Sequence, residues 1–155
     1  MAHNIVIRPM VDSDVEAKGY AHYRTCLETY AGLMDPEVLA GWTLDIYQAI
    51  AQRFLEHTVV AELDGSAVGF GCWESAGIVS AMYILPEYQG LGIGRKLMDA
   101  LLERMTDCTQ IRLQVLEGND SAIGFYRHLG FRFTGEVEMT KYSSVHPALW
   151  MARTV

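Results

Sequence analysis

The segment YILPEYQGLGIG (Tyr83–Gly94) joins the end of an apolar stretch to a run in which every second residue is glycine. The β-rich residues from Ile78 onward predict a strand that ends before Pro86. Beyond the glycines, an apolar stripe at helical spacing predicts a helix: Leu97, Met98, Leu101, Leu102 and Met105. Three glycines in such a loop allow a tight turn, close helix packing, or the approach of backbone N–H groups to a bulky anion.

Arg95 and Lys96 follow the glycines, in the first turn of the expected helix. The helix dipole disfavours cations there, so the pair indicates either a strong anion or a solvated surface pair. Two common phosphate loops are excluded. A dinucleotide-binding fingerprint needs glycine where Arg95 stands, and the Walker pattern G-x-x-x-x-G-K-[ST] is absent.

The residues around this segment predict alternating strands and helices. Asp64-Gly65 is a two-residue hairpin turn between a strand over Thr58–Leu63 and its partner over Ala67–Trp73. Beyond the helix, apolar and polar residues alternate over Ile111–Val115, which predicts another strand. Asn119 is then a good cap for a further helix.

The two ends of the chain complete the expected fold. A short strand at Ile5–Arg8 precedes a helix that a capping box of Ser13 and Glu16 opens, and a further helical pattern runs over residues 35–57. The last expected strands cover residues 131–141 and 148–153. The strand–helix–strand unit is long enough for a parallel crossover, whereas the hairpin is antiparallel. The order predicts a mixed α/β (α+β) fold with helices on both faces of the sheet.

The composition predicts one soluble globular domain over residues 1–155. Twelve basic and 19 acidic residues give a net charge of −7, which argues against a generic nucleic-acid or anionic-membrane binder. The cysteines and histidines are scattered, with no C-x-x-C or H-E-x-x-H, so we expect no metal and no disulfide framework. Residues 1–8 lack the apolar stretch of a signal peptide, and no run approaches the ~18 apolar residues of a membrane span. We therefore expect a cytoplasmic protein.

Two separated motifs resemble those of the GNAT family, the Gcn5-related N-acetyltransferases. Tyr83–Gly94 is similar to that family's central acetyl-CoA motif. The second motif consists of Leu113-Gln114-Val115, Asn119–Tyr126 and Leu129-Gly130-Phe131. The resemblance covers roughly residues 58 to 135. It implies the fold of the family, a mixed, mostly antiparallel central sheet with a splayed parallel strand pair and helices on both faces.

The resemblance implies an acetyl-CoA site between the two splayed strands. The pantetheine arm is expected to pair with the backbone of the first strand, and the pyrophosphate to lie on the glycine loop and the helix that follows it. Asn119 matches a family residue that hydrogen-bonds the arm, and is alternatively a plain helix cap. The residues implied in cofactor binding are Met82, Tyr83, Ile84, Gln89, Gly90, Leu91, Gly92, Ile93, Gly94, Arg95, Asn119 and Tyr126.

The resemblance also implies direct transfer of an acetyl group from the thioester to an amine. Tyr126 matches the family's general acid, which protonates the leaving thiolate; alternatively it is a core tyrosine on an apolar helix face. A backbone N–H near Ile84, where the family's strand bulges, is the expected oxyanion donor. The general base is open. Gln114 stands where some N-terminal acetyltransferases have Glu, and the replacements are Glu74, Glu28, a water chain, or no dedicated base.

The expected acceptor is a small primary amine, such as a polyamine or amino-sugar, since aromatic and carboxylate side chains suit a cation. The residues expected to bind it are Glu28, Tyr30, Trp73 and Tyr83. Two alternatives stay open: acetylation of protein or peptide N-termini, against which Gln114 speaks, and a catalytically silent acyl-CoA-binding module. The last strands, with Phe133 and Trp150, either join in a homodimer across a two-fold axis or pack in the core.

Overall fold

One mixed sheet organises the part of the chain that the computed structural model describes, residues 4–74 and 76–155. Within it, seven strands lie in the order β1-β2-β3-β4-β5-β7-β6. The strands are β1 (Ile5–Pro9), β2 (Thr58–Leu63), β3 (Ser66–Glu74), β4 (Ile78–Ile84), β5 (Gln110–Leu116), β6 (Arg132–Thr140) and β7 (Ser143–Thr154). The helices are α1 (Val15–Tyr30), α2 (Pro36–Ala40), α3 (Leu44–Arg53), α4 (Ile93–Arg104) and α5 (Asp120–His128). Short 3-10 turns cover Asp12–Asp14, Leu55–His57 and Pro86–Tyr88.

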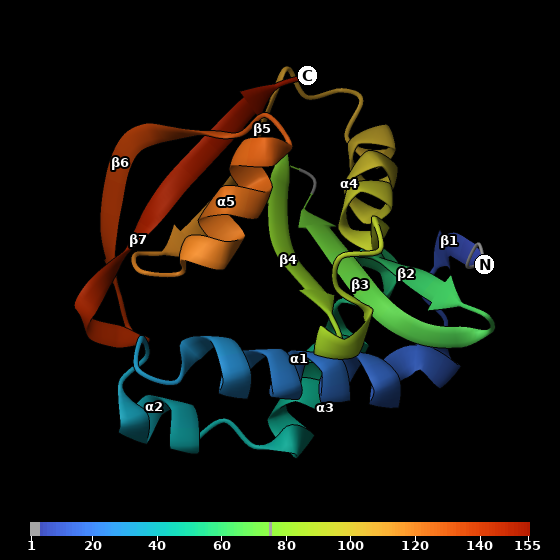
Figure 1. The fold of residues 1–155 in the computed structure, drawn as a ribbon, viewed down its shortest axis with the longest axis horizontal. Coiled ribbons are helices and arrows are strands. Elements are labelled where there is room, and N and C mark those ends of the chain that lie inside the picture. The colour runs from blue at the N-terminus through green and yellow to red at the C-terminus, as the bar shows by residue number, and fades with distance from the viewer. Residues whose placement is uncertain (1–3, 75) are drawn as a thin grey trace.

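Strands β4 and β5 form a parallel pair that separates along its length. β4 pairs with β3 from Ile78 to Ile84, whereas its pairing with β5 is confined to Ile78 opposite Arg112. Figure 1 shows β4 and β5 together at one end and apart near α1. The other neighbouring strands in the described sheet are antiparallel. The predicted mostly antiparallel sheet with a splayed parallel pair is therefore confirmed.

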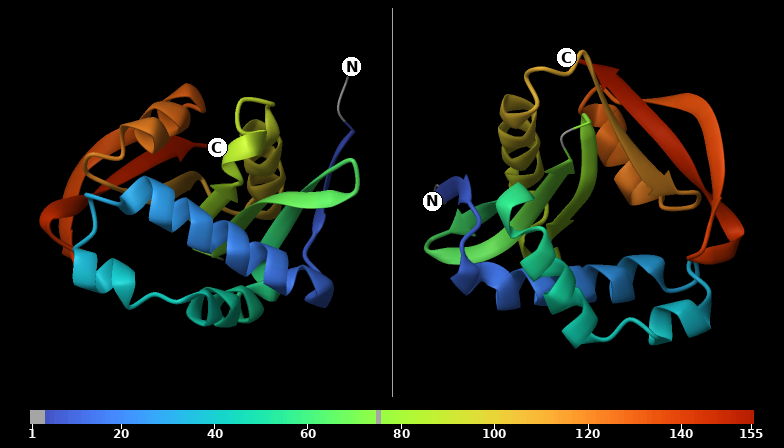
Figure 2. Two further views of the ribbon diagram at one scale, coloured as in Figure 1. Left: turned by 60° about the horizontal axis from the view of Figure 1, so that its bottom comes forward. Right: turned by 180° about the vertical axis from the view of Figure 1, so that it is seen from behind.

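Helices cover both faces of the sheet because β2 alternates its apolar side chains between them. Val59 and Ala61 belong to the apolar cluster that includes α4, whereas Val60 belongs to the cluster that includes residues of α1 and α3. Figure 2 shows α1, α2 and α3 on one side of the sheet, with α4 and α5 on the other. Leu97 and Leu101 of α4 are fully buried, and each such side chain stabilises the fold by about 2 kcal/mol.

The hairpin turn is confirmed, but the predicted start of the first helix is wrong. Asp64 and Gly65 have φ values of 50° and 88°, as a two-residue turn requires. α1 begins at Val15, after the 3-10 turn that contains Ser13. Asp14 precedes α1 without a side-chain capping bond to it, and its carboxylate instead accepts the Val11 amide at the start of the 3-10 turn at 2.9 Å and is held by a bidentate contact with the Arg8 guanidinium.

The helical pattern predicted for residues 35–57 is divided into α2, α3 and a 3-10 turn. α2 ends at Ala40, and Thr43 is extended before α3 begins at Leu44. Between them, the Trp42 ring packs against Tyr47 and Tyr142, with centroids 5.6 and 5.8 Å away. The break therefore brings an aromatic side chain of the first half of the chain onto the turn between β6 and β7.

Three expectations concern a membrane-spanning helix, a metal site and a homodimer. Over residues 4–74 and 76–155, no helix has both the length and the apolar composition to cross a bilayer, and no three His, Cys, Asp or Glu side chains gather as a metal site. Phe133 is 41 % exposed and Trp150 is half-buried. The homodimer remains a prediction.

Candidate active site

Gly90 and Gly92 shape the loop between β4 and α4. Both have φ of +82°, a left-handed conformation that side chains with a Cβ rarely adopt. Open space surrounds the position that a Cβ would take at either residue. Gly92 is also the N-cap of α4, whose first N–H groups lack intrahelical acceptors. The loop therefore leaves the positive end of α4 open to an anion.

Gly94 has a different role from the other two glycines. A Cβ built on it would lie 2.5 Å from Cζ of Phe125, which is closer than any real contact. The absence of a side chain here lets the first turn of α4 pack directly on α5. Gly90 and Gly92 therefore form the turn and leave room for an anion, whereas Gly94 allows close helix packing.

The β5-facing edge of β4 presents backbone amides to the gap. The Leu85 amide donates to Val68 of β3 at 3.0 Å, so the N–H groups of Met82 and Ile84 point the opposite way, towards β5. The Gln89 side chain donates to the Ile84 carbonyl at 3.1 Å and ties the loop to the strand. The prediction of a bulge near Ile84 is wrong. β4 pairs with β3 in regular register from Ile84 to Ala81, and the register shifts between Ala81 and Val79. The Ile84 amide nonetheless faces the gap.

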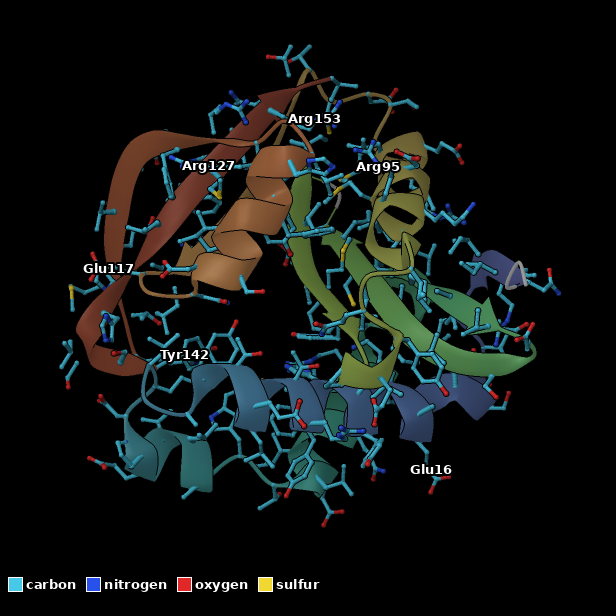
Figure 3. All side chains as sticks on the ribbon, in the orientation of Figure 1. Glu16, Arg95, Glu117, Arg127, Tyr142 and Arg153 are labelled. Atoms are coloured by element: carbon cyan, nitrogen blue, oxygen red, sulfur yellow. The ribbon has the colours of Figure 1, made fainter. Side chains whose placement is uncertain are left out.

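A cavity of about 620 Å³ lies in this gap, between β4, the glycine loop and α5. The predicted cofactor residues that line it are Met82, Tyr83, Ile84, Gln89, Gly90, Gly92, Ile93, Gly94, Arg95, Asn119 and Tyr126. Leu91 is not among its lining residues. Figure 3 labels Arg95, the cation beside the start of α4. Sequence reasoning missed Thr25 of α1, which also lines the cavity and whose buried hydroxyl has no partner among the described residues.

Tyr126 lies on α5 with its phenol in this cavity. Its ring contacts Phe125 and Phe131, with centroids 5.3 and 5.9 Å away. Burial raises the pKa of Tyr126 above its ordinary value, and nearby Tyr30 adds to the effect. The hydroxyl is therefore protonated throughout the neutral range, in the form that a proton donor needs.

Asn119 sits at the N-terminus of α5, where its side-chain oxygen accepts the Ala122 amide at 3.4 Å. Its side chain also hydrogen-bonds Tyr30. Burial raises the pKa of Tyr30 to about 12, and the contact with Asn119 opposes this shift. One buried side chain thus joins the end of α1 to the start of α5.

A second cavity, of about 480 Å³, lies on the α1 side of the same gap. One stripe of α1 lines it at four-residue spacing: Lys18, His22, Cys26 and Tyr30. Trp42 and Tyr142 line it from the far side. Figure 3 shows Tyr142 at the turn between β6 and β7, next to the end of α1. Asp35 fastens this turn, since its carboxylate accepts from the Ser144 amide and hydroxyl at 3.0 to 3.1 Å.

The two cavities meet in the opening between β4 and β5. Four residues line both of them: Tyr30, Tyr83, Gln114 and Val115. A molecule in the larger cavity and a molecule in the smaller one therefore meet at these side chains. This arrangement suits the transfer of a group between two bound molecules.

A family model for the acetyltransferase (GNAT) domain matches residues 55–133, just over half of the chain. The chain belongs to the GNAT family. The match contains β4, the glycine loop, α4, β5 and α5, which are the elements around the larger cavity. α1, which lines the smaller cavity, lies outside it.

Named GNAT relatives match the chain over part of its length. Spermine/spermidine N(1)-acetyltransferase of Bacillus subtilis is 37 % identical over 59 residues, 36 % of this chain and 39 % of the relative. Thialysine N-epsilon-acetyltransferase of Sus scrofa is 36 % identical over 100 residues, 53 % of this chain and 59 % of the relative.

A third relative is known both by name and by structure. Peptidyl-lysine N-acetyltransferase YjaB of Escherichia coli is 34 % identical over 74 residues, 48 % of each chain. The solution structure of apo YjaB superposes with a TM-score of 0.76, at 26 % identity over 96 % of this chain and 97 % of that one. Over the matched segments, the chain spans between 39 % and 59 % of the length of these three relatives.

Besides Leu91, three predicted residues of the GNAT site lie outside both cavities. Glu28 is exposed on α1 and pairs with Arg24 at 3.2 Å. The Trp73 ring is tilted against His57, with centroids 5.2 Å apart, and lies under the Arg104 guanidinium. Glu74 is exposed at the end of β3. The site therefore retains Tyr30 and Tyr83 of the predicted acceptor residues, and neither of the predicted bases.

Sequence reasoning also missed Lys18 and His22, which line the smaller cavity. The His22 ring is stacked on Tyr83, with centroids 4.0 Å apart, and its buried Nδ1 has no partner among the described residues. Burial, with a smaller contribution from the Lys18 charge, lowers the pKa of His22 to about 3. The signal that points to both residues is their four-residue spacing with Cys26 and Tyr30, which places all four on one face of the helix.

Proposed function

We propose that the chain is an acetyl-CoA-dependent N-acetyltransferase that transfers an acetyl group directly to a primary amine of a small molecule. The observation that carries this proposal is the meeting of two cavities at Tyr30, Tyr83, Gln114 and Val115, in the gap between β4 and β5. Acetyl-CoA would occupy the larger cavity and the amine the smaller one. The activities named for the GNAT relatives support the same reaction class.

The residues of the larger cavity fit the chemistry of acetyl-CoA. The open space at Gly90 and Gly92 leaves room for a diphosphate at the N-terminus of α4, and Arg95 supplies a cation there. The outward-facing amides of Met82 and Ile84 offer donors to the amide groups of a pantetheine arm, as an added strand would use them. The thioester would then lie at the opening, within reach of Tyr126.

The proposed reaction is a single displacement at the thioester carbonyl. The amine nitrogen forms a bond to the carbonyl carbon, the carbon–sulfur bond breaks, and the sulfur leaves as coenzyme A thiol. The Ile84 amide would stabilise the oxyanion, and the Tyr126 hydroxyl would donate a proton to the departing sulfur. Burial suits Tyr126 to this role because its raised pKa keeps the proton on the phenol.

The proposal uses no carboxylate base. Among the described residues, no Asp or Glu lines either cavity. Glu138 is near the opening, where Gln114 donates to it at 3.4 Å, but it already accepts the Trp150 indole at 3.0 Å. We infer that the uncharged fraction of the amine attacks and that the proton it loses as the amide forms passes to water, since the buried imidazole of His22, with a pKa of about 3, is too weak a base to hold it. The rate should then rise with pH towards the amine pKa near 10.

One wall of the second cavity supports the choice of a small-molecule acceptor. Trp42 packs on Tyr142, and Asp35 holds Ser144, so residues 35–42 are fastened to the turn between β6 and β7. A long peptide would need that side open.

The alternatives from the sequence remain: a peptide acceptor, favoured by the name of YjaB, and a silent acyl-CoA-binding module. The aromatic rings of Tyr30 and Tyr83 still support a polyamine or amino-sugar as the acceptor. The carboxylates that we expected to bind such a cation are not among the described residues that line the cavity.

In the deciding experiment, the protein is incubated with acetyl-CoA and a panel of polyamines, amino-sugars, amino acids and short peptides. Thiol release and product masses are recorded, and acetyl-CoA binding is measured separately. We expect binding and an acetylated small amine. Products from peptides alone would overturn the small-molecule acceptor, binding without any product would favour the silent module, and absence of binding would overturn the proposal.

A further inference from the structure

We infer that the acceptor amine also carries an anionic group, which the smaller cavity binds at the end away from the acetyl-transfer point. This inference rests on the proposed function and names a class of acceptor for it. The observation behind it is a cavity wall that holds three cations and, among the described residues, no carboxylate. The cations are Lys18, Arg53 and Lys141.

Of the three cations, Lys18 gives the strongest support for the inference. It is 1 % exposed, although it lines the cavity, and no ion pair or hydrogen bond to its ammonium occurs within residues 4–74 and 76–155. Its ammonium is not among the described polar atoms that are both fully buried and without a partner, so it reaches the open space of the cavity. Its neighbour His22 does not offset the charge, because that imidazole is neutral. An anion in the cavity would supply the missing partner.

The carboxylates on neighbouring elements are already engaged. Asp14 accepts from the Arg8 guanidinium at 2.8 and 2.9 Å, and Asp35 accepts from Ser144. Glu138 is engaged by Trp150 and Gln114, at the opening between the cavities. Arg53 and Lys141 lie over the rings of Phe54 and Tyr142, without an ion pair in the described part of the chain. No carboxylate among the described residues therefore balances the cations that line the cavity.

The arrangement along α1 separates the anion from the amine. The opening reaches α1 at His22, which is stacked on Tyr83, and Lys18 is one helical turn earlier, about 6 Å along the helix axis. A reactive amine at the opening therefore leaves the remainder of the molecule pointing towards Lys18. An anionic end is attracted there, whereas the second ammonium of a diamine is repelled.

The test uses pairs of amines that differ in one anionic group. L-lysine and cadaverine differ by the carboxylate, and phosphoethanolamine and ethanolamine differ by the phosphate; spermidine is measured beside them. We expect kcat/KM for one anionic member to exceed that for the counterpart that lacks the anionic group by about tenfold to hundredfold, as a charged hydrogen bond provides. The pair that shows the preference tells a carboxylate from a phosphate.

Two variants assign the preference to the cavity. Lys18→Met keeps the length of the side chain without its charge, and Arg53→Gln changes an exposed residue that does not support the core. Each should lower the ratio of kcat/KM within the pair at least about fivefold, whatever its effect on the rate with the amine that lacks the anion. The ratio is internal to each variant, so partial unfolding does not alter it. Arg104→Gln, which removes an arginine outside both cavities, should leave the ratio at its wild-type value.

The outcomes separate this inference from the proposed function. Equal rates within every pair, a preference for cadaverine or spermidine, or a ratio that Lys18→Met and Arg53→Gln both leave unchanged would overturn the anionic acceptor while acetyl transfer stands. Failure of acetyl-CoA to bind, or absence of product from any amine or peptide, would overturn the proposed function itself.

Discussion

The imidazole of His22 stacks on the phenol ring of Tyr83, with ring centroids 4.0 Å apart and planes inclined by 20°. The contact joins α1 to β4 across the opening between the two cavities. It also places a titratable ring where water has little access, edge-on to Tyr47 at 4.5 Å and near the Lys18 ammonium. The fold therefore depends on a histidine that stays uncharged.

This burial predicts acid lability. Burial lowers the pKa of His22 to about 3, whereas a histidine in the unfolded chain titrates near 6.5. Between these values the unfolded state binds a proton that the folded state does not, so the free energy of unfolding falls as the pH falls below 6.5. At pH 5 the loss from this residue is about 2 kcal/mol relative to pH 7.5. Urea unfolding of the wild type and His22→Phe at both pH values measures it.

The phenylalanine keeps an aromatic ring on Tyr83 but removes the titration. The variant should therefore lose about 2 kcal/mol less than the wild type between pH 7.5 and 5. His128→Gln, at an exposed position of α5, should lose as much as the wild type. Equal losses in the wild type and His22→Phe would show that His22 is not the buried neutral group described above.

Gly94 and Phe125 predict a pair of coupled substitutions. Gly94→Ala places a Cβ 2.5 Å from the Phe125 ring and should destabilise the fold by about 1–3 kcal/mol. Gly94→Ala combined with Phe125→Leu should lose less than the sum of the single variants, because the smaller side chain leaves room for the methyl group. Thermal or urea unfolding of the four proteins measures this coupling.

Gly124→Ala is the matched control for this pair. Gly124 lies within α5 with open space around it, so alanine there should stabilise the helix by about 0.5–1 kcal/mol. Additive losses from Gly94→Ala and Phe125→Leu would mean that the glycine does not serve the packing of α4 on α5.

The larger cavity was predictable from sequence because short segments build it. Gly90 and Gly92 take the left-handed backbone conformation that glycine favours, and the helix with its apolar stripe follows directly. Asn119 caps α5 as its residue type predicts. Local propensity and a linear motif carry this information, so eleven of the twelve implied cofactor residues line one cavity, with Leu91 as the exception.

The smaller cavity was less predictable because distant segments build it. Lys18 and His22 reach the cavity only when α1 is packed across β4, which no local pattern specifies. Trp73 and Glu74 are close in sequence to residues of the site but lie outside both cavities. Alternation along the strand sends Trp73 to the face opposite Cys72, which lines the smaller cavity, whereas Glu74 is exposed at the last position of the strand.

The hydrogen bonds between Asp35 and Ser144 predict that a substitution of Asp35 weakens binding of the acceptor amine and not that of acetyl-CoA. Asp35→Ala removes the carboxylate that holds the Ser144 amide and hydroxyl, which loosens the wall formed by Trp42 and Tyr142. We expect KM for the amine to rise about tenfold, with the dissociation constant of acetyl-CoA changed less than about twofold. Steady-state kinetics and calorimetry measure the two quantities. Glu37→Ala, an exposed carboxylate in α2, should change neither; weaker acetyl-CoA binding in Asp35→Ala would contradict a role confined to the acceptor side.

Tyr126→Phe separates proton donation from packing. The substitution keeps the ring between Phe125 and Phe131 and removes only the hydroxyl, so acetyl-CoA binding should change less than about threefold while kcat falls about 10²-fold to 10³-fold. Because burial raises the pKa of Tyr126, the wild type should show no loss of rate on the alkaline side up to pH 10 from ionisation of this phenol. Tyr20→Phe, an exposed tyrosine of α1 outside both cavities, should retain wild-type kcat. If Tyr126→Phe also retains it, the hydroxyl is not the proton donor, and the thiolate must leave unprotonated or take its proton from water in the larger cavity.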